Sequence, residues 1–343
     1  MILRHPMPRP RLTLLALLAL AACQAPEPPP PARVAATRPM ARPAEPGPSQ
    51  AELRQARAER NRAANAAAAE ALVLASSVST AQRDFYARAE TALRDQGRLR
   101  RDRVPQDAPI DAPTLARNFL DIALRDEYGP GGLQAGTGGA PAPLRRWAEP
   151  VRLQVEFGDS SDVATRRAYR IEVSGYAARL AAASGHPVSL AENGGNFVVM
   201  VLSDDERRAI GPRLAQLVPG IPPQDIVAMQ QLDPDNFCTV FAYSHGAAPV
   251  YSRAVALIRS ELTPLLQTSC IHEELAQGMG LANDSPAARP SIFNDDEEFA
   301  LLTRHDELLL AILYDERLHP GMNRAEAEPI VRQIAEELLP PAP

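Results

Sequence analysis

The sequence predicts an α+β fold, in which a small mixed sheet comes first and helices follow. Three observations favour it. Residues 151–157 alternate between apolar and polar side chains, as a half-buried strand does, and residues 197–202 form a continuous apolar run typical of a fully buried strand. Residues 237–243 and 251–258 predict a further pair of strands. From residue 265 onward the pattern is predominantly helical.

The composition separates a non-globular start from this folded part and excludes several functions. Twelve of the 34 prolines lie before residue 49, so that stretch has little to bury. The formal net charge of −6 leaves no basic excess to neutralise phosphates, and we expect no nucleic-acid partner. Every cationic side chain is arginine, which excludes Schiff-base chemistry and a phosphate-loop lysine. Aromatic residues make up only 5%, too few for a platform on which bases stack.

Residues 1–22 have the pattern of a lipoprotein signal peptide. Arginines precede a short apolar run, residues 12–22, which is too short to span a bilayer as a helix. The run ends in Leu-Ala-Ala-Cys at Cys23, which resembles a bacterial lipobox, whose cysteine receives diacylglycerol. The absence of an aspartate after Cys23 favours the outer membrane. We therefore expect acylated Cys23 to anchor the mature chain in that lipid bilayer.

Residues 23–49 are expected to form a proline-rich tether, because proline favours an extended and semi-rigid chain. Residues 50–83 are alanine-rich, with an apolar stripe between Leu72 and Val78. This pattern predicts a helical stalk, and its heptads are too few to require a coiled-coil dimer. The folded domain is expected over residues 84–343.

Within the folded domain, caps and breakers bound the expected elements. The first helix is expected to end at Gly97, a typical C-cap, and the second to begin after Asp111. Residues 129–143 are glycine-rich and predict a flexible excursion. Two further helices are expected over residues 161–183 and 204–217.

Cys238 and Cys270 remain after the lipidated cysteine. In an exported chain, two such cysteines are candidates for a disulfide. The bond would tie the strand at 238 to a helix near 270 and stabilise the fold by about 3–4 kcal/mol in the chain-entropy description. Two buried free thiols or a soft-metal pair are the alternatives. Zinc binding through sulfur has little support, because a CxxC arrangement is absent.

The helix near Cys270 carries the spacing of a zinc-binding helix. Residues 273–283 have the spacing HExxHxxGxxH, the metzincin zinc signature. Positions i and i+4 of such a helix share one face and bind the ion, the second residue activates water, and the glycine turns the chain so that a third ligand returns. Here the shared face holds Glu273 and Gln277, the general-base position Glu274, the turn Gly280, and the third ligand position Asn283.

All three ligand histidines of that signature are replaced. A carboxylate can bind zinc, but the carboxamide oxygens of Gln277 and Asn283 are weak ligands for it. Calcium suits such oxygens better, yet it requires six or more of them. We therefore expect a zincin-like scaffold without the metal, in which Glu273, Gln277 and Asn283 line a cleft. Bound zinc or calcium, with Glu274 as the general base, is the alternative.

The remaining residues of this helix predict an amphipathic, half-buried element. Ile271, Leu275 and Met279 form an apolar stripe on the face opposite the ligand positions. His272 lies about 100° round the helix from Glu273. It is therefore expected to be packed or solvent-facing, and not a ligand.

The other polar clusters favour structural roles. Asn294 or Asp295 is expected to cap the next helix, with the acidic residues that follow in its first turn. His305 and Asp306 are neighbours in sequence and point about 100° apart on a helix, which disfavours an acid–base pair. A GxSxG elbow, which would support a nucleophilic triad, is absent.

Several stretches resemble an uncharacterised family of Gram-negative lipoproteins that carry one domain of unknown function. The longest is residues 270–322, which begin CIHEELAQGMGLANDS, and residues 113–119 and 146–152 are similar too. The resemblance spans most of residues 84–340 and implies a zincin-like fold and an envelope location, but no established activity. Phe293 stands where metzincins have the methionine of the turn beneath the metal.

The sequence thus predicts a periplasm-facing lipoprotein of the outer membrane. Its domain is expected to bind a periplasmic protein, a peptide or a wall polymer without zinc catalysis. An active metal-dependent hydrolase is one alternative. A purely architectural envelope factor, which uses the stalk for assembly, is the other.

Overall fold

The computed structural model describes residues 55, 59, 62, 77–129, 132–294 and 296–340. The expected signal peptide, Cys23, the tether and most of the stalk lie outside these residues. Every described residue lies in one unit of the chain, residues 51–343. Among the described residues, no helix combines the length and the apolar character needed to cross a bilayer.

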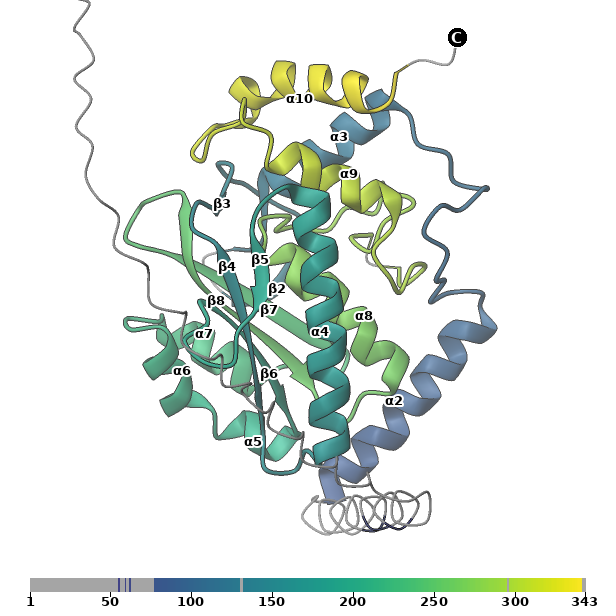
Figure 1. Ribbon diagram of the computed structural model, residues 1–343, viewed down its shortest axis with the longest axis vertical. Coiled ribbons are helices and arrows are strands. Elements are labelled where there is room, and N and C mark those ends of the chain that lie inside the picture. The colour runs from purple at the N-terminus through teal and green to yellow at the C-terminus, as the bar shows by residue number, and fades with distance from the viewer. Residues whose placement is uncertain are drawn as a thin grey trace, which may run out of the picture. The chain divides into compact units, whose positions relative to one another are not determined.

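A mixed sheet of six strands lies at the centre of this unit (Figure 1). Strands β5, β4, β6 and β8 follow one another in this order and are parallel, and the short β3 pairs in parallel with the start of β8. Strand β7 pairs with β8 in the antiparallel direction. The strands are β3 (Arg146–Trp147), β4 (Val151–Phe157), β5 (Val188–Leu190), β6 (Phe197–Leu202), β7 (Cys238–Ser244) and β8 (Val250–Arg259).

The predicted strands are confirmed where the side-chain pattern is strong. β4 has the predicted bounds, and its residues Val151 and Leu153 are buried while Arg152 between them is exposed. β6 also has the predicted bounds, and all six of its residues are buried because helices cover both faces of the sheet. The predicted pair at 237–243 and 251–258 corresponds to β7 and β8.

Helices cover both faces of the sheet, and each face has its own apolar core (Figure 1). The larger core joins one face to α3 (Ala112–Ala123), α4 (Val163–Ser184), α8 (Pro264–Gln277), α9 (Arg304–Leu313) and α10 (Arg324–Leu338). The smaller core joins the other face to α6 (Gly211–Leu217) and α7 (Pro223–Gln230), with α5 (Asp204–Arg208) beside them. The described residues thus form an α+β fold, as predicted.

Two of the expected helices have their predicted starts or ends for the expected reason. The Asp111 carboxylate accepts the N–H of Thr114 at 2.8 Å, which caps α3. Gly97, just after the end of α2 (Ser77–Asp95), has a φ of +75°, the left-handed conformation that glycine adopts readily. The single helix predicted over 204–217 is wrong, because Pro212 lacks an N–H and starts a second helix there.

The flexible excursion predicted for residues 129–143 is also wrong. β1 (Arg125–Gly129) and β2 (Gly132–Pro141) form an antiparallel pair that joins Arg125 to Pro141. Strand prediction depends on alternating side chains, and glycine has none to alternate. The hydrogen-bonding groups of the main chain nevertheless pair.

The predicted helix cap at Asn294 or Asp295 is wrong for Asn294, and Asp295 lies outside the described residues. The next helix, α9, begins at Arg304. Its N-cap is Thr303, whose hydroxyl accepts the N–H of Asp306, while the Asp306 carboxylate accepts the N–H of Thr303.

Glu298, in the acidic run after Asn294, binds one arginine from a distant part of the chain and one that precedes it by a few residues. Glu298 accepts hydrogen bonds from Arg100 at 2.9 Å and from Arg289 at 2.7 Å. Asp107 accepts from the same two arginines, at 2.7 and 2.8 Å. These contacts hold the loop before α9 against the segment between α2 and α3.

The helix α2 crosses the expected domain boundary at residue 84. Ser79 is fully buried and donates a hydrogen bond to Glu261 at 2.5 Å. The amide of Gln82 donates to Asp204 at 3.2 Å. The packed part of the chain therefore begins no later than Ser79.

The expected disulfide is present between Cys238 and Cys270. It joins the first residue of β7 to the middle of α8, which begins at Pro264 and not near residue 270. The bond fixes the edge of the sheet against the helix that carries the candidate site.

Candidate functional site

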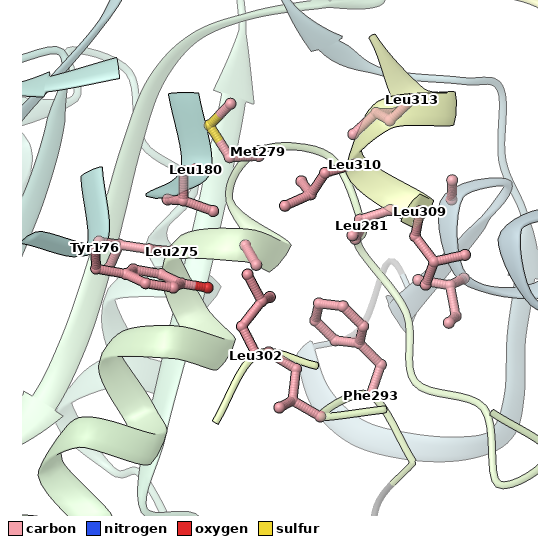
Figure 2. Packing of buried hydrophobic residues seen from close by; sticks show 14 of the residues in the cluster. Tyr176, Leu180, Leu275, Met279, Leu281, Phe293, Leu302, Leu309, Leu310 and Leu313 are labelled. Atoms are coloured by element: carbon pink, nitrogen blue, oxygen red, sulfur yellow. The ribbon is translucent and has the colours of Figure 1, made fainter. Parts of the chain in front are cut away.

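Helix α8 carries the candidate site, and its second half is buried on nearly all sides. Between Ser269 and Gly280, only Glu273 is not fully buried. β7, β8 and α4 all contact the helix. Figure 2 shows Leu275 and Met279 among side chains of α4 and α9. The prediction of a half-buried amphipathic helix is therefore wrong for this part of α8, because its polar residues other than Glu273 are buried as well.

His272 is packed in the core, which is one of the two roles expected for it. Its ring stacks on Tyr176, with centroids 4.0 Å apart. Its Nδ1 accepts the N–H of Leu302 at 3.0 Å, and its Nε2 lies 3.5 Å from a carboxylate oxygen of Glu172. Burial lowers the pKa of His272 below its ordinary value. The neutral ring thus joins α8 to the loop before α9.

The lowered pKa of His272 predicts a loss of stability in mild acid. Below about pH 6.5 the unfolded chain binds a proton at this residue that the folded chain does not, so stability falls as the pH drops. His272→Gln should lose less free energy of unfolding than the wild type between about pH 7.5 and pH 5.5, measured by urea unfolding. An equal loss in both proteins would contradict this. Burial also lowers the pKa of His186, but this residue is present in both proteins and so cannot cause a difference between them.

The two glutamates of the motif lie side by side on α8 with different exposure. Glu274, at the general-base position, is only 4% exposed. Glu273 is partly exposed, and its charge contributes to raising the pKa of Tyr176, although burial is the main cause there. The helix thus carries one buried carboxylate beside one that reaches its surface.

Gln277 and Asn283 both contact Asp284. The Gln277 amide donates to the Asp284 carboxylate at 3.3 Å. The Asn283 amide donates to the main-chain oxygens of Asp284 and Asp121, at 2.6 and 2.9 Å. Both side chains are buried. Two of the three predicted ligand positions thus share the neighbour Asp284 and serve as hydrogen-bonding groups.

Gly280 makes the turn that the motif requires. Its φ of +126° is a conformation that side-chain-bearing residues rarely adopt. A Cβ at this position would lie 2.4 Å from the main-chain oxygen of Arg145. The turn between Gln277 and Asn283 therefore needs glycine for two separate reasons.

Gly280→Ala is expected to lower the free energy of unfolding by at least about 2 kcal/mol, because strain and a clash with main chain add. Urea unfolding measures the loss. Gly175, inside α4 with nothing near its missing Cβ, is the matched control. Gly175→Ala should raise stability by about 0.5–1 kcal/mol. A Gly280→Ala protein as stable as the wild type would show that the turn does not need glycine.

The donor set is poor for a metal. Among the residues that the structure describes, no group of three or more His, Cys, Asp or Glu side chains is arranged to hold an ion. An ion at this point would depend on the carboxylates of Glu273 and Asp284 and on amide oxygens. Zinc binds such a set weakly, and calcium needs more oxygens.

A buried polar network next to the site escaped sequence reasoning. Asp306 is fully buried and accepts hydrogen bonds from the hydroxyl of Ser291 at 2.6 Å and from the N–H of Thr303 at 2.8 Å. The neighbouring His305 is also fully buried: its Nδ1 lies 3.6 Å from a carboxylate oxygen of Asp306, and its Nε2 contacts the Asn118 amide at 3.1 Å. In the sequence, only the Thr-x-x-Asp spacing of Thr303 and Asp306, which is typical of a helix N-cap, indicates part of this network.

Phe293, at the expected position of the methionine turn, is fully buried. Figure 2 shows it in the same cluster as Leu281 and Leu302. The preceding Ser291 binds Asp306 and also accepts the N–H of Phe293 at 3.0 Å. This loop is therefore packed beneath the segment that follows α8.

Residues 112–333 match a family that is described as a protein of unknown function (DUF2927). The chain belongs to the DUF2927 family. The expected domain of unknown function is thereby confirmed over those residues. No curated protein and no solved structure matches the chain.

The DUF2927 stretch contains the whole sheet, α8 with its turn, and both cysteines of the disulfide. The buried Asp306 network also lies entirely within it. Helix α2 precedes it, although Ser79 and Gln82 pack against residues of the DUF2927 domain. The packed unit is therefore somewhat larger than the matched stretch.

Proposed function

We propose that this protein is a lipoprotein of the outer membrane, facing the periplasm, and that its DUF2927 domain is a zincin-like scaffold without zinc catalysis. The domain would bind a peptide, a protein segment or a wall polymer. The signal-like residues 1–22 and the lipobox ending at Cys23 support the location.

The amides of Asn283 and Gln277 carry the non-catalytic part of the proposal, because they stand where the zinc signature has histidines and are weak ligands for zinc. Both hydrogens of its amide nitrogen are directed at main-chain oxygens, those of Asp121 and Asp284. The Gln277 amide likewise donates to Asp284. These side chains serve as buried hydrogen-bonding groups. Breaking their hydrogen bonds would leave buried polar atoms unpaired, which costs free energy.

Two features support the zincin-like part. A small mixed sheet precedes α8, and further helices follow it, which is the expected order of elements. Gly280 makes a sharp turn directly after α8, where the metzincin spacing places its glycine. The metzincin-like spacing of residues 273–283 is thus accompanied by the turn that such a zinc site uses to return its third ligand.

Peptide hydrolysis tests the non-catalytic proposal against its alternative, a metal-dependent hydrolase in which Glu274 activates water. The purified full chain, supplied with zinc or calcium, should hydrolyse a mixture of peptides no faster than Glu274→Gln. Hydrolysis by the wild type that is lost in Glu274→Gln would overturn the proposal in favour of the hydrolase.

Cys23→Ala tests the proposed anchor. The wild type should incorporate labelled palmitate and sediment with outer membranes, whereas Cys23→Ala should do neither. A Cys23→Ala protein that still carries label would show that the lipid is attached elsewhere. Exchange of the neighbouring Gln24 for Asn, which keeps the cysteine, is the matched control.

A further inference from the structure

A hollow of about 380 Å³ lies over the amino ends of β4, β6 and β8, outside the candidate site. Exposed polar side chains and the partly buried edge of the sheet line it together. Its lining includes Trp147, Glu149, Arg152, Asn196 and Arg253.

Strand register places two of the lining arginines in one row. Leu153 of β4 pairs with Phe197 of β6, which pairs with Ala254 of β8. The residues directly before these three, Arg152, Asn196 and Arg253, therefore form the next row across the sheet. The N–H of Asn196 donates to the Arg152 oxygen at 3.0 Å, which continues the pairing to this row. Two strand spacings separate the main chains of the arginines by about 10 Å.

Both arginines point to the same face of the sheet. Leu153 and Ala254 belong to the larger core, so their neighbours Arg152 and Arg253 lie on the opposite face. Both are exposed. Between them stands Asn196, which is buried and has both polar atoms of its side chain bonded to main chain, at Arg152 and Pro150. Two cationic side chains thus lie on either side of Asn196, whose side-chain hydrogen bonds are already made within the protein.

Neither arginine is neutralised by a carboxylate of the described residues. Arg152 and Arg253 make only long hydrogen bonds, of 3.5 Å each, to the main-chain oxygens of Gly194 and Ser252. By contrast, Glu156 on the same strand as Arg152 is paired with Arg213 at 2.5 Å. The hollow contains one carboxylate, Glu149, so its two arginines leave an excess of positive charge.

We propose that this hollow binds an anionic ligand with two acidic groups, carboxylates or phosphates, and that Arg152 and Arg253 each pair with one of them. Guanidinium groups match both kinds of oxyanion in geometry. The spacing of the row favours a dianion, because a single small acidic group would engage one arginine at a time. This inference does not rest on the proposed function, since it uses no residue of the degenerate zinc motif.

Trp147 supplies the measurement, because it is the only tryptophan of the chain and lines the hollow. Its indole N–H is held by the main-chain oxygen of Gly278 at 2.8 Å. Tryptophan fluorescence of the full chain is titrated with glutarate, a dicarboxylate, and with pyrophosphate, at constant ionic strength. We expect a saturable change with at least one of them, and which one responds identifies the acidic group. Acetate should bind at least about tenfold more weakly.

Variants decide whether the arginines are responsible. Arg152→Gln and Arg253→Gln should each raise the midpoint of the titration about tenfold or more. Glu149→Gln should lower it, because it removes the one opposing charge. Arg167→Gln, at an exposed arginine on α4, is the matched control and should leave it unchanged. The absence of saturation with both dianions, or an equal effect of Arg167→Gln, would overturn the proposal.

Discussion

Replacing Asp306 with alanine is expected to lower the free energy of unfolding by about 3–5 kcal/mol. This fully buried carboxylate accepts the hydroxyls of Ser291 and Thr303, at 2.6 and 2.8 Å, and the N–H of Thr303 at 2.8 Å. Alanine would leave the Ser291 hydroxyl and the N–H of Thr303 buried without this acceptor, while the Thr303 hydroxyl also has the main-chain oxygen of Pro290 at 2.9 Å. It would also release the loop before α9 from its helix. Urea unfolding followed by circular dichroism measures the loss.

Two further variants make this prediction specific. Ser291→Ala removes one donor and leaves the other hydrogen bonds of Asp306 in place, so it should cost about 1–2 kcal/mol. Glu316→Ala, at an exposed carboxylate after α9, should change stability by less than about 0.5 kcal/mol. If Asp306→Ala cost no more than Glu316→Ala, the network would not hold the loop as described.

Removing the disulfide with Cys238→Ala and Cys270→Ala together should lower the free energy of unfolding by about 3–4 kcal/mol. The two cysteines are 32 residues apart, and the bond restricts that loop in the unfolded chain. Because the bond joins the edge strand β7 to α8, its loss should also loosen the helix that carries Glu274. Urea unfolding of the double variant and the oxidised wild type measures the difference.

A reductant provides the control for the disulfide prediction. It should destabilise the wild type by a similar amount and leave the double variant unchanged, because the variant has no bond to break. Wild-type unfolding that does not respond to a reductant would show that the bond is absent or without effect. The double variant also loses packing around the buried Cys270, whereas the reduced wild type keeps both sulfur atoms. Any extra loss of stability in the double variant therefore measures this packing.

Local side-chain patterns allowed part of the fold to be predicted. The alternation in β4 and the unbroken apolar run of β6 gave their bounds directly, and Asp111 marked the start of α3. The β1–β2 pair was missed because glycine gives no alternation. The acidic run after Asn294 resembles a helix start in sequence, and its partner Arg100 comes from a segment that only the folded chain brings near.

The candidate site was predictable to a similar extent. The spacing in α8 predicted the turn at Gly280, and the two cysteines suggested their bond. Sequence could not show that the polar residues of α8 are buried, since the partners of His272 come from α4 and from the loop before α9. The partners of Asn283 and Asp306 are likewise main-chain and side-chain groups from distant elements.

Zinc retention by the wild type and by the triple variant Glu273→His, Gln277→His, Asn283→His tests the central claim most directly. Both proteins are dialysed against zinc, and the metal that remains bound is counted per chain. If α8 and its turn form a zincin-like scaffold that has lost its ligands, the wild type retains far less than one zinc and the triple variant retains about one. One tightly held zinc in the wild type would contradict the loss of the metal. No zinc in the correctly folded triple variant would contradict the scaffold.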